Sequence, residues 1–446
     1  MAAFEEVATW AAELEQLGAC IAPRFGRVEP RRRALAYLRG LLAPIERKNG
    51  WQLVETAGDA TPDGMQDFLN RMRWDADQVR DDLRAYVVEH LGDPGAVLVL
   101  DETGFVTKGA HSVGVQRQYA GTAGRIENCQ IGVFLAYASG KGHALIDRAL
   151  YLPERWAGHA PRRTEAGVPD EIGFATKPKL GLAMLQRALA AGVPFAWMTG
   201  DSVYGSDHRL RRLIERHGRG YVLAVTSAQH LGLKPVEDWL EDVPARGWQR
   251  LSAGDGAKGP RLYDWAYLPY RSLVAEGWKT GLLIRRSIKE PGQLAFYLTL
   301  APATTSLAEL VRVAGMRWAI EACFEAAKGE VGLDQYEVRS WTGWHRHVTL
   351  AMLAHAYLAV VRQTAIGGSG DGRPRRRPAT PHRAGGAAPA VAAGVGAAAR
   401  SPAGHQLVAL ATSTPAARPT LPLAPTNQQY TSTVVLEPAA GWSGAS

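Results

Sequence analysis

Apolar residues recur at helical spacing through the first ninety residues of the chain. Their period of about 3.6 residues predicts amphipathic helices at Phe4–Leu17, Arg31–Leu42, Asp63–Met72 and Asp75–Leu91. No alternating or continuously apolar stretch competes with this pattern, and Gly92-Asp93-Pro94-Gly95 is a typical break. The sequence therefore predicts an α-helical domain at residues 1–92.

Beyond this break, short apolar runs alternate with helical periods. Ala96–Leu100 is continuously apolar, which is typical of a strand buried on both faces, and it ends in Asp101-Glu102-Thr103-Gly104. Thr176 and Ser206 are expected to cap two helices. Further strands are predicted at Val113–Tyr119, Asn128–Ala138, Ala144–Leu152, Pro194–Gly200 and Tyr221–Val225. The alternation predicts an α/β fold at residues 93–226, with a mixed sheet and flanking helices.

Residues 227–305 change to short, aromatic-rich β segments and are interpreted as a β-rich insertion. Four tryptophans fall in it (Trp239, Trp248, Trp265 and Trp278). Each is expected in the core, with stacking on an extruded base as the alternative. The α/β pattern then resumes at residues 306–365, where a final apolar helix is predicted near Val348–Val361.

One long helix is predicted from Ser306 to Lys328, opened by a capping box at Ser306 and Glu309. At about 100° per residue, Arg317, Glu321 and Lys328 lie within about 40° of one another on one face. A carboxylate between two cations suits a metal ion beside a phosphate backbone.

The formal charge of +8 favours an anionic partner, but its distribution weakens this argument. From Ile366 onward there are seven arginines and only two acids, so this segment carries +5 of the total. Three separate cysteines make disulfides and zinc sites unexpected. No apolar run is long enough to cross a membrane, so we expect a cytoplasmic, nucleoid-associated protein.

Two strand-end aspartates and a glutamate on a later helix could form an acidic triad. Asp201 follows the strand Pro194–Gly200 as Asp101 follows Ala96–Leu100, and Glu321 is the third acid. Such a triad can hold two Mg²⁺ ions about 4 Å apart and activate a water or a 3′-hydroxyl toward a phosphodiester. Judged by spacing alone, incidental acids are an equal alternative.

The three motifs together resemble the DDE transposases of bacterial insertion sequences. They are DETGF at 101–105, GDSVYG at 200–205 and R-x3-E-x6-K from Arg317 through Glu321 to Lys328. The resemblance is to the group with the YREK signature, and within it to the insertion-sequence family numbered seven hundred and one. It covers roughly Arg24 to Val361.

The resemblance implies an RNase H-like core, interrupted before the glutamate helix by a β-rich insertion. It also implies Asp101, Asp201 and Glu321 as catalytic and metal-binding acids for two Mg²⁺ ions, with Mn²⁺ as a substitute. Arg317 and Lys328 would contact the element's terminal phosphates. The implied partners are double-stranded DNA, comprising inverted-repeat ends and target, and a second copy of the chain on that DNA.

Some assignments stay open at this point. The signature's tyrosine would fall at Ala314, so its contact is either absent or supplied elsewhere, with Trp318 and Tyr336 as the candidates. Glu325 is the rival third acid.

Several basic or histidine side chains have a DNA-binding and a structural interpretation. Arg117 and Arg125 lie on a predicted hairpin, where they are expected either to contact phosphate or to be solvated. Arg31, Arg32, Arg33 and the segment PDGMQDFLNRMR belong to a DNA-reading helix-turn-helix or to a plain bundle. His345 and His347 are assigned to packing ahead of phosphate contacts.

Residues 366–446 are low-complexity sequence rich in Ala, Gly, Pro and Arg, which predicts disorder. A sharper hypothesis is out-of-frame translation of a GC-rich gene. The chain is thus expected to be a transposase. The alternatives are a catalytically defective copy that binds DNA ends, and an RNase H-like nuclease without strand transfer.

Overall fold

The computed structural model describes residues 2–256, 258–270 and 274–367. Its N-terminal part is entirely helical, as the apolar pattern predicts. The helices are α1 (Ala2–Ile21), the short 3₁₀ helix η1 (Ala22–Arg24), α2 (Val28–Leu42), α3 (Gly50–Ala57), α4 (Asp63–Asn70) and α5 (Ala76–Leu91). The sequence analysis missed α3, which has only two turns between its Asn49 cap and Gly58 in the left-handed conformation.

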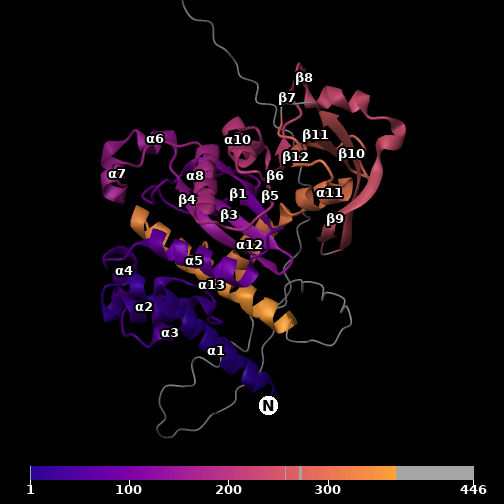
Figure 1. Ribbon diagram of the computed structural model, residues 1–446. Coiled ribbons are helices and arrows are strands. Elements are labelled where there is room, and N and C mark those ends of the chain that lie inside the picture. Colours follow the sequence, from indigo (N-terminus) through magenta and orange to yellow (C-terminus); the bar gives the residue numbers. More distant parts are fainter. Residues whose placement is uncertain (1, 257, 271–273, 368–446) are drawn as a thin grey trace, which may run out of the picture. The chain divides into compact units, whose positions relative to one another are not determined.

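A single large mixed sheet forms the centre of the described chain (Figure 1). Its strands follow the order β2-β3-β1-β5-β6-β12-β11-β10-β9, and β4 pairs with β3 off this path. The bounds are β1 (Val97–Val106), β2 (Gln116–Ala120), β3 (Arg125–Ser139), β4 (Gly142–Tyr151), β5 (Trp197–Gly200), β6 (Gly220–Val225), β9 (Gln249–Gly256), β10 (Gly259–Tyr270), β11 (Trp278–Arg286) and β12 (Leu294–Pro302). The pairs β1–β5 and β5–β6 are parallel, and the other pairs are antiparallel.

Helices cover both faces of the central strands, as Figure 1 shows. Helix α8 (Lys177–Ala190) and helix α5 both form ion pairs with β4. Arg187 of α8 lies 2.8 Å from Asp147, and Asp77 of α5 lies 2.6 Å from Arg148. Arg80 of α5 also comes within 3.8 Å of Asp147. The remaining helices are α6 (Glu154–Ala157), α7 (Ala160–Ala166), α8 (Lys177–Ala190), α9 (Ser202–Gly205), α10 (His208–Arg216), α11 (Leu307–Gly315), α12 (Trp318–Val331) and α13 (Trp341–Gly367), with η2 (Gly121–Ala123) between β2 and β3. Both helix α12 and helix α13 lie on the α5 side, since Phe324 packs against Phe134 and Thr349 accepts a hydrogen bond from Arg148.

Strand β1 is longer than the sequence predicts. It does not end at Asp101 but continues to Val106, because β3 pairs with it over its whole length. The parallel pairing with β5 does stop at Leu100–Gly200. Asp101 is therefore within the strand, at the point where β1 loses its neighbour on one side.

The predicted helix Ser306–Lys328 is wrong in its continuity. Ser306 does cap a helix, since its Oγ accepts a hydrogen bond from Glu309 N at 3.2 Å. That helix, α11, ends at Gly315, and α12 starts at Trp318. Gly315 packs directly on β9, where a Cβ would lie 2.0 Å from Ala253 O. This close contact lies where the helix is interrupted between α11 and α12. The spacing of apolar residues does not indicate the interruption.

The predicted cap at Ser206 is also wrong. Asp207 caps α10, and its carboxylate accepts hydrogen bonds from the amides of Arg209 and Leu210. Thr176 caps α8 as predicted, through Lys179 N.

Residues 227–305 are rich in strands, as predicted, and they extend the central sheet. β12 pairs with β6, and β11, β10 and β9 follow in order. A small hairpin of β7 (His230–Leu231) and β8 (Lys234–Pro235) and the 3₁₀ helices η3 (Val236–Asp242) and η4 (Ala245–Gly247) precede them. Trp265 is fully buried and the other three tryptophans of this segment are partly buried, which confirms their expected role in packing.

The predicted low-complexity segment 366–446 and its reading-frame origin lie outside the described residues, apart from the end of α13. None of the helices in the described part combines the length and apolarity needed to cross a bilayer.

We predict that Gly205→Ala destabilises the protein. A Cβ at this position would lie 1.9 Å from Ala224 O, so the turn after Asp201 must move away from β6. Overpacking of this kind costs about 1–3 kcal/mol. The change in unfolding free energy, measured by urea denaturation, would test it. Gly173→Ala is the control, because a Cβ there meets nothing within 4 Å. Equal stability of the two variants would contradict the prediction.

Candidate active site

The parallel pairing of β1 and β5 brings two predicted acids together. The register runs from Val97–Trp197 to Leu100–Gly200, so Asp101 and Asp201 are next in line on the two strands. Adjacent strands lie about 4.8 Å apart. Both acids thus occupy the carboxyl end of a parallel pair, where open α/β sheets bind their ligands.

The two carboxylates repel each other in a poorly solvated place. Burial raises the pKa of Asp101 to about 8, and the charges of Asp201 and Glu102 add to this, against a lowering by Arg317. Burial and Glu102 also raise the pKa of Asp201, although Arg317 and the amides of Val203 and Tyr204 oppose them. In the absence of a cation, the pair therefore tends to hold a proton rather than two negative charges.

Glu102 lies on the other face of β1, as strand alternation predicts. Its carboxylate accepts hydrogen bonds from Lys177 Nζ at 2.6 Å and from the Tyr204 hydroxyl at 2.5 Å. Lys177 opens α8, and Tyr204 follows Asp201 by three residues. Glu102 thus ties the Asp201 turn to β1. The sequence analysis missed this network, although Tyr204 stands within the GDSVYG motif that it quoted.

Arg317 connects the aspartate pair with Glu321. Its guanidinium lies 3.6 Å from Glu321 Oε1. Burial acts to lower the pKa of Arg317, but the surrounding Asp101, Tyr297, Glu321 and Asp201 raise it overall. Burial raises the pKa of Glu321, opposed by Arg317 and Arg261. The structure thus brings three of the predicted site residues into the electrostatic field of one arginine.

A small pocket of about 120 Å³ adjoins Arg317 and Glu321. Ala314, the expected place of the signature's tyrosine, lines it and is buried. Tyr297 of β12 supplies a phenol ring to this pocket, and Trp318 supplies a half-exposed indole. Tyr336, the other substitute considered, is committed to hydrogen bonds with Gln130 and Trp344.

The ammonium group of Lys328 forms hydrogen bonds within the protein. Its Nζ donates to Thr103 Oγ1 at 2.8 Å, to Gly104 O at 3.0 Å and to Thr122 Oγ1 at 3.3 Å. Burial lowers its pKa. Lys328 therefore fixes α12 to β1, and its contact with phosphate stays a prediction.

The other candidates divide into exposed and internally paired groups. Arg117 and Arg125 are exposed on the β2–β3 hairpin, and Arg125 forms an ion pair with Glu127 at 2.6 Å. Glu325, the rival third acid, is exposed on α12 and does not line the pocket that Glu321 lines.

Of the two predicted packing histidines, His347 is buried and His345 is partly buried. His347 accepts from or donates to the Tyr37 hydroxyl at 2.7 Å, and His345 contacts Trp341 O at 2.9 Å. In the N-terminal basic cluster, Arg31 donates to Phe25 O and Arg33 pairs with Asp59, while Arg32 is exposed.

The donor set fits a hard cation only in part. Asp101 and Asp201 offer neighbouring carboxyl oxygens, which in the deprotonated form are the ligand type that Mg²⁺ prefers. Glu321, however, is engaged by Arg317. Among the described residues, no three His, Cys, Asp or Glu side chains converge closely enough to hold a metal ion.

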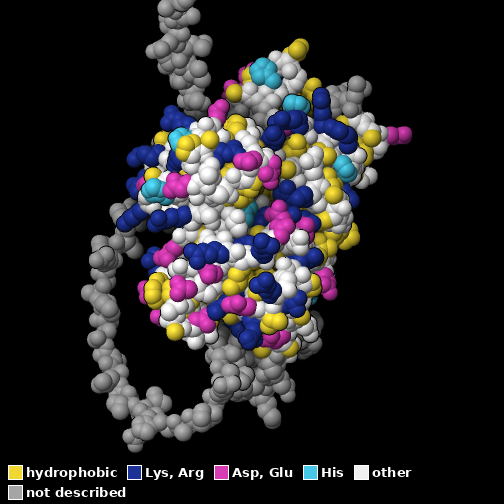
Figure 2. Space-filling view, turned by 90° about the vertical axis from the view of Figure 1, so that its left-hand side faces the viewer, with side chains coloured by type: hydrophobic (Ala, Val, Ile, Leu, Met, Phe, Trp, Pro, Cys, Tyr) yellow, Lys and Arg dark blue, Asp and Glu magenta, His cyan; other side chains and the backbone are white. Residues whose placement is uncertain are grey.

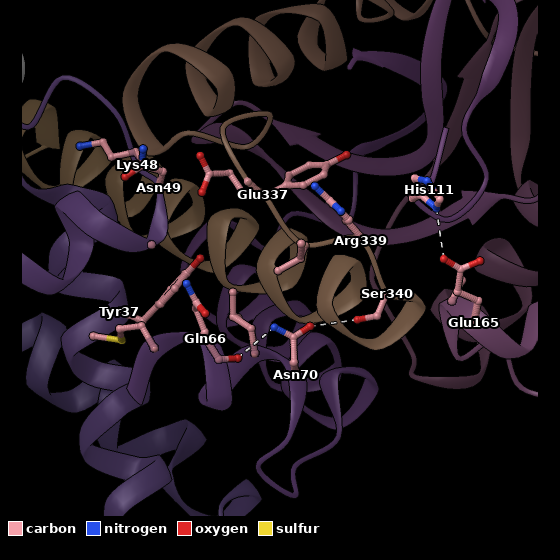
Figure 3. A pocket seen from close by; sticks show the side chains of 16 residues that line it. Tyr37, Lys48, Asn49, Gln66, Asn70, His111, Glu165, Glu337, Arg339 and Ser340 are labelled. Atoms are coloured by element: carbon pink, nitrogen blue, oxygen red, sulfur yellow. Dashed lines mark hydrogen bonds and ion pairs between the residues drawn. The ribbon is translucent and has the colours of Figure 1, made fainter. Parts of the chain in front are cut away.

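A larger pocket lies elsewhere and contains none of these acids. It has a volume of about 930 Å³ and lies between the N-terminal helices and the segment before α13 (Figure 3). Some of its polar groups contact one another, as Ser340 does with Asn70 and His111 with Glu165. On the face in Figure 2, basic side chains are interspersed with acidic ones, so charge alone marks no single DNA surface there.

This fold and these acids define the class of protein. A family model described as the DDE superfamily endonuclease matches residues 20–246, about half of the chain. The chain belongs to this family. The match includes Asp101 and Asp201 and ends before Glu321.

A curated relative gives a more particular likeness. The chain is 25% identical over 221 residues to the probable transposase for insertion sequence element IS701 from Microchaete diplosiphon. The aligned region covers 49% of this chain and 54% of that protein, so the chain spans about half the length of the relative.

We predict that, without divalent cations, Asp101→Asn becomes more stable relative to the wild type as pH rises. The folded-state pKa near 8 lies above the unfolded value near 4, so wild-type stability falls with rising pH across this window. The unfolding free energy of the variant minus that of the wild type should grow by at most about 1.4 kcal/mol per pH unit and level off above pH 8. Urea denaturation in EDTA at several pH values measures it, and a pH-independent difference would refute it.

Proposed function

We propose that the chain is a DNA transposase of an insertion sequence, which cleaves DNA at the element's inverted-repeat ends and joins them to target DNA. The observation that carries the proposal is the placement of Asp101 beside Asp201, directly after the point where the parallel pairing of β1 with β5 stops. Membership of the DDE endonuclease family and the likeness to a probable transposase support it. The core is proposed to be RNase H-like, with residues 227–305 as its insertion.

Asp101 and Asp201 are the proposed ligands of a divalent cation, Mg²⁺ or Mn²⁺, with Glu321 as the third. When bound, such cations polarise a phosphodiester and activate the attacking oxygen. The protein's own contribution is the placement of these carboxylates. Arg317, within the field of all three acids, is proposed to keep Glu321 near the pair and to face the substrate phosphate.

The roles of the acids within this site differ. Glu102 is excluded from the ligand set by its bonds to Lys177 and Tyr204 and is proposed to position Asp201. Transposases of this kind act on two DNA ends, so a homodimer on DNA is part of the proposal.

Asp201→Asn should abolish Mg²⁺-dependent end cleavage while leaving DNA binding within about twofold, because the amide keeps the shape of the side chain but removes its charge. The assay combines the full chain, both element ends and a target plasmid. Joined product in the wild type supports a transposase, cleavage alone supports a nuclease, and a gel shift alone supports a binding protein. Cleavage retained in the variant would sink the assignment of Asp201.

Glu321→Gln and Glu325→Gln form a matched pair on α12. Only Glu321 contacts Arg317 and lines the pocket, whereas Glu325 is exposed. The first substitution should reduce end cleavage at least about 100-fold, since removal of a catalytic group commonly has an effect of 10²–10⁴. The second should stay within about threefold of the wild type. The reverse order of effects would transfer the role of third acid to Glu325.

A further inference from the structure

The pocket beside Glu321 is rich in arginine. Three guanidinium groups line it, from Arg261 of β10, Arg285 of β11 and Arg317. Glu321 is the acid that lines it with them. The pocket is therefore a locally cationic place next to the catalytic acids, and none of the sequence motifs pointed to Arg261 or Arg285.

Arg261 is held in place by uncharged groups. Its Nη2 donates to Ala253 O at 2.8 Å and to Gly315 O at 3.3 Å, and its guanidinium lies 5.3 Å from the centroid of the Trp318 ring. Among the described residues, no carboxylate comes within ion-pair distance of it. These contacts fix the position of the side chain without a direct ion pair, and the carboxylates that act on its charge, those of Glu321 and Asp255, are more distant.

Arg285 and the next residue, Arg286, differ in the same respect. Arg285 lies across from Trp265 in the β10–β11 register and stacks over Tyr263, 4.5 Å from the ring centroid. Arg286 points to the opposite face of β11, where Asp264 lies 3.4 Å away and Trp248 lies under its guanidinium. Within the described part of the chain, Arg285 thus has no carboxylate at ion-pair distance on the pocket face. Arg286, on the other face, has one that it shares with Arg250.

We propose that Arg261 and Arg285 bind the phosphate backbone of the DNA strand that enters the active site, so that the β-rich segment forms part of the DNA-binding surface. This inference rests on the proposed function, whose substrate is DNA. Guanidinium groups are weakly hydrated, match phosphate oxygens in pairs and stack on aromatic rings, and both arginines have such an aromatic support. Lying beside Glu321, they hold a phosphate close to the acids.

Salt dependence of DNA binding tests the proposal without any cleavage. The full-length protein is titrated in EDTA with a fluorescein-labelled duplex of about 40 base pairs, from about 50 to about 200 mM NaCl. Each phosphate contact adds about 0.9 to the slope of log K against log salt. Arg285→Gln should reduce the magnitude of this slope by about 1 and weaken binding several-fold at about 100 mM salt. Arg285→Lys, which keeps the charge, should restore most of the slope.

Arg286→Gln is the matched control on the same strand, and its slope should equal that of the wild type. Thermal unfolding of each variant verifies that the fold is intact. If Arg285→Gln does not fold, Arg261→Gln carries the test, because loss of its proposed phosphate contact should also reduce the slope by about 1. Equal slopes for Arg285→Gln and the wild type, or equal losses in Arg285→Gln and Arg286→Gln, would overturn the proposal.

Failure of this inference differs from failure of the proposed function. If the protein binds DNA and the slope is unchanged in Arg285→Gln, only the proposed arginine contacts are refuted. If Arg285→Gln reduces the slope but the wild-type protein never cleaves DNA, the arginine contacts are supported and the proposed enzymatic function is refuted. If the wild-type protein does not bind DNA at all, both the arginine contacts and the proposed function are refuted.

Discussion

The parallel pairing of β1 with β5 is the constraint on which the site depends. The two strands come from positions about a hundred residues apart, and their first contacts are the hydrogen bonds of Ala196 and Trp197 to Ala96 O. The buried Tyr137 hydroxyl bonds to Asp93 and to Pro194 O, which precede the two strands. Because side chains alternate along a strand, a slip of one residue would turn Asp101 to the face of Glu102. The register therefore determines which acid meets Asp201.

The charged groups around Asp101 and Asp201 are divided between the two faces of β1. On one face of β1, Asp101 lies near Asp201 and Arg317, while on the other face Glu102 is neutralised by Lys177. Lys328 anchors α12 to β1 through three oxygen acceptors, so the helix that carries Glu321 cannot shift along the sheet without breaking them. Burial and mutual repulsion raise the pKa values of the aspartate pair, so a cation bound there would stabilise the charged form of both carboxylates.

Much of this arrangement could be predicted from local patterns, and the failures have physical causes. Apolar periodicity located the N-terminal helices and the buried strands, since each buries one face against the core. It did not show that β1 continues past Asp101, because β3 provides that pairing from a distant segment. It also missed the interruption at Met316 and Arg317, where close packing of Gly315 on β9 accompanies a break in a sequence that favours a continuous helix. Glu321 was found through its spacing from Arg317, whereas Arg261 and Arg285 gave no signal because strand register alone brings them to the same pocket.

The extension of the sheet through β12 explains why the site needs the chain beyond the matched region. The family model ends at residue 246, after both aspartates, yet β6 takes its second neighbour from β12. Without β12, the buried strand β6 would present an unpaired edge that invites pairing with other chains. Tyr297 lies on that same β12 and faces Arg317. The strand that completes the sheet thus also brings the aromatic and cationic residues of the β-rich segment to Glu321, so that stability of the core and assembly of the site depend on one pairing.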